Sequence, residues 1–97
     1  MATTGRPRGS RDRLGRCTRR VPISEPFVRY MREVGVRIRE LREEQDVAAS
    51  ELAAALNVHR ATVQHWESGI RTPTIANLYR ISVALGVRVS DILEIEP

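Results

Sequence analysis

Apolar residues recur at helical spacing along most of the chain after residue 24. Because side chains three and four positions apart share one face of an α-helix, this spacing predicts a helix from about residue 26 to residue 45. Gly35 interrupts the stripe and weakens a helix by about 1 kcal/mol relative to alanine. The pattern therefore leaves open one helix or two, over 26–34 and 36–45. The stripe consists of Phe27, Met31, Val34, Ile38 and Leu41.

Two short helices are predicted next, over about 49–56 and 60–68. Asn57 follows the first and tolerates the left-handed conformation that closes a helix, and Gly69 ends the second. The first has an apolar face made by Leu52, Ala53 and Leu56. The second has only two apolar anchors, Val63 and Trp66, which we expect in the core. Its other side chains are polar or small, so they should face solvent or a ligand.

The C-terminal part of the chain predicts a longer helix over 75–85 and a last short helix over about 89–93. Thr74 can cap the longer helix, and Gly86 stands where a C-terminal glycine belongs. No stretch shows the alternation of a strand together with turn residues. We therefore predict an all-α domain of four to five helices. The apolar stripe of the longer helix consists of Ile75, Leu78, Ile81 and Leu85.

Charge divides the chain at about residue 24. Residues 1–24 hold seven arginines and one acid, a net charge of +6, whereas residues 25–97 hold nine arginines and eleven acids, a net charge of −2. The N-terminal segment is rich in Gly, Arg, Ser, Thr and Pro and has no amphipathic period, so we expect it to be disordered. The sequence therefore predicts a flexible basic arm over 1–24, suited to a polyanion, and one domain over 25–97.

Several classes of protein are excluded by composition. A single cysteine, Cys17, allows no internal disulfide and fits a reducing compartment. No apolar run approaches the roughly 20 residues of a membrane helix, so we expect a cytoplasmic protein without membrane contact. No paired carboxylates, activated nucleophile or glycine-rich phosphate loop indicates an enzyme or a cofactor. His59 and His65 lie six positions apart with no completing ligand, so no metal site is predicted.

Residues 36–93 resemble the Cro and phage-repressor family of helix-turn-helix proteins, also called XRE-type regulators. The resemblance implies a compact lambda-repressor-like DNA-binding domain that regulates transcription, as a repressor, with helix 60–68 in the major groove. It implies a DNA duplex as partner and association with the nucleoid. The motifs that carry it are IRELREEQ at 38–45, ELAAALNV at 51–58, TVQHWESG at 62–69, Pro73, and LYRISVALGV at 78–87.

The resemblance also implies roles for individual residues. A helix of about nine residues is roughly 13 Å long and fits a major groove that is roughly 12 Å wide. Arg42 and Glu67 match an ion pair that ties the first helix to the end of the recognition helix. The positions expected to read bases are Arg60, Ala61, Thr62, Gln64 and His65. Those expected to contact phosphates are His59, Ser68 and Arg71.

The chain departs from the family where the second and third helices begin. The family has Ser or Thr followed by Gln at the first of these places, where this chain has Ala48 and Ala49. His59 is a weak cap for the third helix. The missing cap at Ala48 costs about 1 kcal/mol, and Ala49 cannot bond the phosphate that the family's Gln reaches. We expect weak DNA binding by residues 25–97 alone.

The basic arm can compensate for this weak binding. GRPR at 5–8 resembles the core of an AT-hook, in which Arg-Pro lies in the minor groove of A·T-rich DNA. Arg6 and Arg8 are therefore candidate contacts to the DNA backbone or minor groove. A solvated arm, or one that contacts another protein, is the alternative.

A homodimer is expected, because paired recognition helices about 34 Å apart read palindromes in this family. The stripe of Phe27, Met31 and Val34 precedes the family's usual start, and it either packs on its own domain or forms a dimer contact. A different class of function also stays open. Some relatives are antitoxins or scaffold subunits, and a protein-interaction module would tolerate weak DNA binding.

Overall fold

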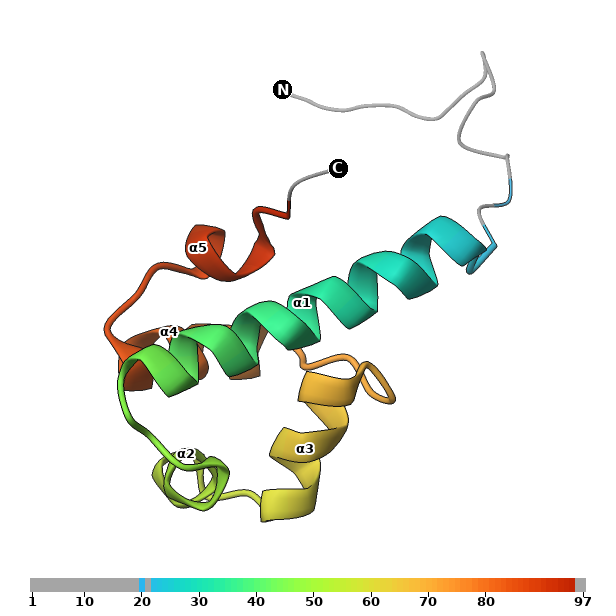
Figure 1. The fold of residues 1–97 in the computed structure, drawn as a ribbon. Coiled ribbons are helices and arrows are strands. Elements are labelled where there is room, and N and C mark those ends of the chain that lie inside the picture. The colour runs from blue at the N-terminus through green and yellow to red at the C-terminus, as the bar shows by residue number, and fades with distance from the viewer. Residues whose placement is uncertain (1–19, 21, 96–97) are drawn as a thin grey trace, which may run out of the picture.

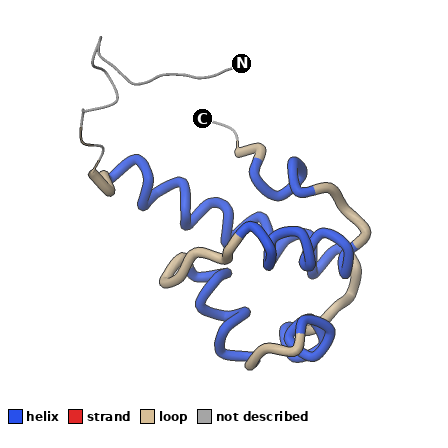
Figure 2. The backbone as a smooth tube through the Cα atoms, turned by 180° about the vertical axis from the view of Figure 1, so that it is seen from behind, coloured by secondary structure: helices blue, strands red, loops and turns tan. Residues whose placement is uncertain are grey.

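The computed structural model describes Arg20 and residues 22–95 and contains five α-helices (Figure 1). They are α1 (Glu25–Glu44), α2 (Ala49–Leu56), α3 (Arg60–Ser68), α4 (Ile75–Leu85) and α5 (Val89–Leu93). The part of the chain that the structure describes contains no strand (Figure 2), so the all-α prediction is confirmed. Each of its helices is too short or too polar to cross a lipid bilayer. The predicted arm lies outside the described residues, apart from Arg20 and 22–24.

Gly35 lies within a single continuous α1, which settles whether one helix or two form there. A Cβ atom at this position would lie 2.4 Å from the carbonyl oxygen of Trp66 and 2.5 Å from that of Glu67. Since real side chains do not approach so closely, glycine is required where α1 crosses the end of α3. The residue that weakens α1 locally is therefore the one that lets the two helices touch.

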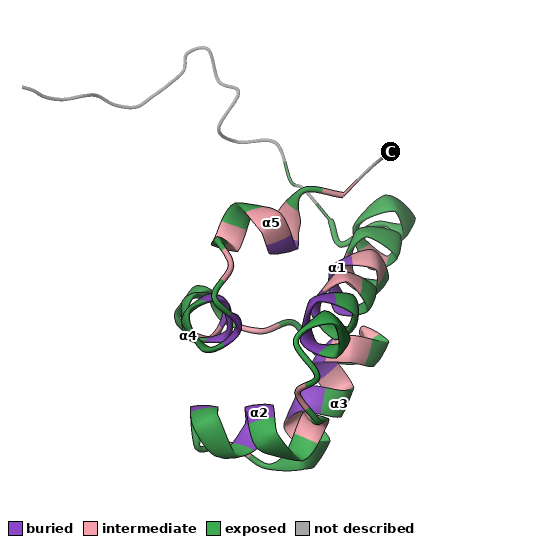
Figure 3. Ribbon diagram, turned by 60° about the vertical axis from the view of Figure 1, so that its left-hand side comes forward, coloured by how far each residue is buried: buried purple, intermediate pink, exposed green. Residues whose placement is uncertain are grey.

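One core joins all five helices, with α3 packed on α1 and α2, and α5 packed on α1 and α4. The buried positions face inward between the helices (Figure 3). Most of the predicted anchors are buried, including Trp66, of which 4% is exposed. The buried apolar residues are Val34, Ile38, Leu41, Leu52, Ala53, Leu56, Val63, Trp66, Leu78, Ile81, Leu85 and Ile92.

The apolar stripe predicted for α4 is wrong at its first position, because 83% of Ile75 is exposed. The core face of α4 is made by Leu78, Ile81, Ser82 and Leu85. Ile75 stands on the first turn at four-residue steps from Tyr79 and Val83, which are also exposed. Spacing by three from Leu78 indicated the core face, although Ile75 belongs to the outward row.

The helix starts differ from one another in how their first backbone N–H groups are bonded. At α4 the N–H of Asn77 donates to Thr74 Oγ1 at 3.1 Å, as predicted. Ala48 offers no side-chain acceptor to α2, but the Glu51 carboxylate accepts from the Ala48 N–H at 2.7 Å. Half of a reciprocal capping arrangement is therefore present, and α2 loses less than the sequence suggested. His59 makes no side-chain hydrogen bond to α3.

Candidate nucleic-acid interface

Helix α3 has a buried face and an exposed face, and this division decides which side chains are free. Val63 is fully buried and Trp66 nearly so. At 100° per residue, these two anchors turn most of the other positions outward, except Glu67, whose side chain faces α1. Arg60, Ala61 and Gln64 are exposed, and Thr62 and His65 are partly exposed. The structure therefore brings the five positions expected to read bases onto one short, solvent-accessible surface.

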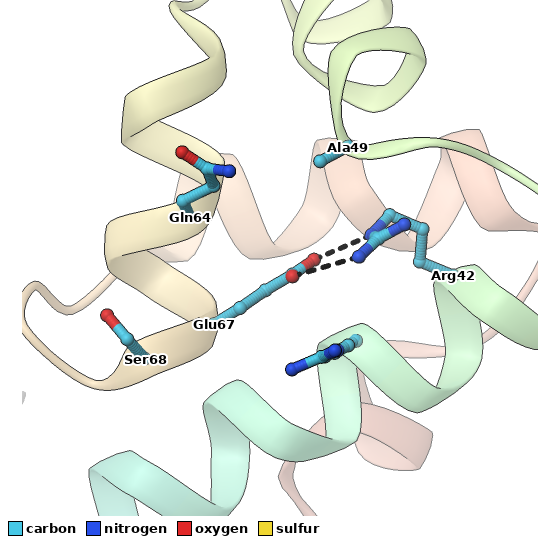
Figure 4. Close-up of a pocket in the computed structure, with 6 residues that line it drawn as sticks. Arg42, Ala49, Gln64, Glu67 and Ser68 are labelled. Carbon is cyan, nitrogen blue, oxygen red and sulfur yellow. Dashed lines mark hydrogen bonds and ion pairs between the residues drawn. The ribbon is translucent and has the colours of Figure 1, made fainter.

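The end of α3 is fastened to α1 by an ion pair. Arg42 Nε donates to Glu67 Oε2 at 2.7 Å, and Arg42 Nη2 donates to Glu67 Oε1 at 3.1 Å (Figure 4). Only 11% of the Arg42 side chain and 9% of the Glu67 side chain are exposed. The hydrogen bond with Glu67 is the main reason that the pKa of Arg42 is raised. Arg42 Nη1 also donates to the Val47 carbonyl at 2.8 Å.

The loop after α3 is held to the helix by one carbonyl group. The His65 carbonyl accepts hydrogen bonds from the backbone N–H groups of Ile70 and Arg71, at 3.0 and 3.2 Å. Gly69 makes this turn possible, because it adopts a φ of 81°. Ser68 and Arg71, both expected to contact phosphates, are exposed at the two ends of this turn.

A hollow of about 280 Å³ lies between α1, the start of α2 and α3. Figure 4 shows Gln64 and Ser68 projecting from α3 beside the ion pair, with Ala49 at the start of α2. Ala49 is small, so the hollow stays open where the family carries Gln. The residues that line the hollow are Arg39, Arg42, Ala49, Gln64, Glu67 and Ser68.

Sequence reasoning missed Arg39 as a residue of this surface. It lies three residues before Arg42, hence on the same side of α1. Its side chain is 63% exposed, and Nε lies 3.2 Å from the Glu43 carboxylate. This spacing was the one available signal, because the Arg42–Glu67 pair already indicated which side of α1 faces α3. Arg39 gives the hollow a cation that is not engaged in a buried pair.

The other expected site residues do not join this surface in the same way. His59 is exposed at the start of α3, beside Arg60. Arg6 and Arg8 lie outside the described residues. Among the residues that the structure describes, no group of three His, Cys, Asp or Glu side chains is placed to hold a metal ion.

The profile of the helix-turn-helix family HTH_3 matches residues 38–92, which is more than half of the chain. The chain belongs to this helix-turn-helix family. The match begins in the second half of α1 and ends in α5, so it includes α2, α3 and the loop after α3. The first part of α1, with Phe27 and Met31, precedes it.

Solved structures of helix-turn-helix proteins are similar to this chain. The restriction-modification controller protein C.AhdI from Aeromonas hydrophila is 26% identical, with a TM-score of 0.62 over 64% of this chain and 94% of that one. The clp gene regulator ClgR from C. glutamicum is 28% identical, with a TM-score of 0.65 over 67% of this chain and 83% of that one.

A third similar structure was solved in complex with DNA. It is the biofilm master regulator SinR, which is 33% identical, with a TM-score of 0.58 over 62% of this chain and 97% of the SinR chain. A search of curated proteins finds no match to the chain.

Proposed function

We propose that this helix-turn-helix protein represses transcription by binding specific operator sequences with α3 in the major groove. The observation that carries the proposal is the two-sided α3. Its inner side is fixed by Val63, Trp66 and the Arg42–Glu67 pair, while Arg60, Ala61 and Gln64 stay exposed.

The general function follows from the family match and from the similar regulators of known structure. The protein is a DNA-binding transcriptional regulator and not an enzyme. The sign of regulation, the bases and the residues that read them are the specific parts of the proposal. We also infer that it acts in the cytoplasm at the nucleoid.

Each exposed residue of α3 suits a particular contact. The Arg60 guanidinium can bond both acceptors of a guanine, and Gln64 can bond the acceptor and donor of an adenine. The Ala61 methyl group can contact a thymine methyl group. Thr62 and His65 are partly buried and stand at the rim, where they reach base edges or sugar oxygens.

Phosphate contacts are assigned to residues around α3 and in the arm. His59 lies before α3, and Ser68 and Arg71 lie after it, so the two sets bracket the groove-reading surface. We add Arg39, whose exposed guanidinium lines the hollow beside α3 and offers a phosphate donor where Ala49 has none. Arg6 and Arg8 extend the basic surface to the adjacent minor groove.

We infer that the protein binds as a two-fold dimer, because a single short helix reads only a few base pairs. Two recognition helices spaced by about 34 Å, one turn of DNA, would read a palindromic site. The two-fold symmetry of such a dimer would match the symmetry of the operator.

The test begins with selection of bound sequences from a random duplex pool by the intact protein. Affinity for the selected duplex is then compared between the wild type and Arg60→Ala. We expect the substitution to weaken specific binding by about 1–3 kcal/mol and to relax the preference at one base pair per half-site. Arg88→Ala is the matched control, since Arg88 is an exposed arginine just before α5. It should leave affinity unchanged.

An equal loss on selected and random duplexes would assign Arg60 to phosphate and contradict the base-reading role. Failure to select any sequence, together with a protein that co-purifies stoichiometrically, would favour the protein-interaction alternative.

A further inference from the structure

Helix α4 carries apolar residues on both of its sides. Leu78, Ile81 and Leu85 face the core, whereas Ile75, Tyr79 and Val83 face outward with exposed fractions of 83%, 62% and 63%. The outward residues recur every four positions and therefore form one row along the helix, called here the α4 row. In Figure 3, where α4 is seen nearly end-on, its exposed positions lie on the side away from α1.

The α4 row carries no free charge. The one charged residue of α4 is Arg80, and its guanidinium donates to the Leu56 carbonyl and to Asn77 Oδ1. It is therefore engaged by the protein's own chain at the end of α2. A neutral apolar row does not complement a nucleic acid or a charged peptide, but two such rows can meet without repulsion between like charges.

The size of the α4 row fits a functional contact of modest strength. Its three side chains are each more than half exposed, and the largest apolar patch on a typical monomer, often a functional one, covers roughly 300–600 Å². Three side chains from each of two copies are fewer than the roughly 20–30 residues a side of standard stable interfaces, so we expect a reversible contact. A hollow of about 360 Å³, lined in part by Ala55 and Ala84, adjoins the row and can take a side chain.

The α4 row is also symmetric about its centre. Ile75 lies four positions before Tyr79, and Val83 lies four positions after it. If two copies of α4 cross antiparallel about a two-fold axis at Tyr79, Ile75 meets the partner's Val83 and Tyr79 meets the partner's Tyr79. The even spacing therefore allows the reciprocal contact that a two-fold interface requires.

We propose that the α4 row is the surface through which two copies of this chain associate. The alternative surface at the start of α1 is covered more by the protein's own chain than the α4 row, because Phe27 and Tyr30 are only 38% and 40% exposed. Val34 is buried, and Tyr30 donates to the Leu93 carbonyl at 2.8 Å. The proposal rests on the proposed function in one respect, because a dimer that reads DNA needs a surface that joins its two copies. Self-association itself is measured without DNA.

The first experiment is sedimentation equilibrium of the full-length chain over a range of concentrations. We expect a reversible monomer–dimer equilibrium that Val83→Arg weakens at least ten-fold. The charge suits the folded monomer, because a cation near the C-terminus of α4 is favoured by the helix dipole. The matched control is Val36→Arg on α1, a position that is likewise exposed. It should leave the equilibrium unchanged.

The antiparallel arrangement is tested by restoring complementarity. Ile75→Glu alone should also weaken association at least ten-fold, since it places a charge in an apolar contact. In the double variant Ile75→Glu/Val83→Arg, each introduced carboxylate meets the partner's introduced guanidinium, and association should recover by several-fold over either single variant. Single losses without recovery would overturn the antiparallel arrangement. A wild type that stays monomeric both free and on DNA would overturn the whole proposal.

A DNA experiment separates this proposal from the proposed function. Val83→Arg should bind a duplex with one selected half-site as the wild type does, but lose the tighter binding to a duplex with two. Arg60→Ala should weaken both while leaving self-association intact. Loss of half-site binding in Val83→Arg would contradict a role confined to dimerisation.

Discussion

The two ends of α3 differ in how firmly the protein holds them. At the C-terminal end, Trp66 is buried, Glu67 is paired with Arg42, and Gly35 brings α1 into backbone contact. At the N-terminal end, His59 and Arg60 are exposed, and the side chain of His59 bonds none of the first N–H groups of the helix. The fixed end sets the direction of α3. At the open end the Thr62 N–H donates to the His59 carbonyl, and the His59 side chain accepts no backbone N–H.

The start of α3 differs from the starts of α2, α4 and α5, although α1 likewise begins without a side-chain cap. Helix α4 begins at Thr74, whose hydroxyl caps it, while Glu51 and Asp91 reach back to the N–H groups that precede α2 and α5. Under the proposed function, the first N–H groups of α3 would face a phosphate, which is a strong acceptor for them. Under this proposal, the missing side-chain cap of α3 weakens the free protein but leaves the start of the helix open to a DNA phosphate.

The largest expected effect comes from breaking the fixed end. Glu67→Gln leaves the Arg42 guanidinium buried without a counter-charge, and we expect it to lower the free energy of unfolding by about 3 kcal/mol. Urea denaturation followed by circular dichroism measures the change. Glu43→Gln is the control, because Glu43 forms an exposed pair with Arg39. It should cost less than about 1 kcal/mol. A loss as small as the control's would mean that the pair does not fasten α3.

The next effect comes from separating α1 and α3 at Gly35. Gly35→Ala gains about 1 kcal/mol of helix propensity. The added methyl group must nevertheless push the Trp66 carbonyl away, and such overpacking costs about 1–3 kcal/mol. We expect a net loss of stability and a change in fluorescence, which is specific because Trp66 is the one tryptophan of the chain. Val36→Ala, on the exposed neighbouring position, should change neither. A stabilised Gly35→Ala variant would show that the helices separate without cost.

A smaller effect, of opposite sign, is expected at the open end. His59→Ser supplies a hydroxyl that can accept from the first N–H groups of α3, and we expect it to stabilise the protein by about 1 kcal/mol. Thermal unfolding measures the gain. Thr74→Ala removes a cap that is present at α4 and should cost a similar amount. No gain from His59→Ser would argue that the start of α3 is already satisfied in the free protein.

The smallest effect concerns Asp91, whose carboxylate accepts the Arg88 N–H at the start of α5. The His59 side chain accepts no N–H group at the start of α3. The hydrogen bond from the Arg88 N–H, followed by the charges of Arg88 and Arg37, lowers the pKa of Asp91. Because the folded pKa lies below the unfolded one, the stability it contributes is complete above about pH 4. It is lost as the pH falls through the folded pKa. Asp91→Asn should therefore melt below the wild type at pH 7, and the difference should shrink in acid. A difference that is constant with pH would contradict this.

Much of the fold could be predicted because the apolar residues of each helix recur every three or four positions and so mark its buried face. The bounds of α2, α3 and α4 could be predicted because an apolar face runs along each helix and Asn57, Gly69 and Gly86 end them. The spacing of apolar residues does not show which residues of different helices touch one another. The sequence therefore indicated only that Gly35 weakens α1, and it wrongly placed Ile75 in the core.

The candidate site divides in the same way. The inward position of Trp66 is enough to turn Arg60 outward, so that side of α3 could be predicted. Arg39 had only one signal, its spacing of three from Arg42, and its place in the hollow also depends on how α1 crosses α3. The Glu51 bond to the Ala48 N–H was missed because the family pattern drew attention to the absent hydroxyl and not to the acid three positions later.

The turn after α3 has a consequence for the thermodynamics of binding. Since the Ile70 and Arg71 N–H groups share the His65 carbonyl, the backbone of the turn is ordered before any ligand arrives. The spacing between Arg60 and Arg71 is thereby set in advance, and within this turn only side-chain rotamers remain to be frozen on association. Part of the entropic penalty of recognition is thus already met during folding.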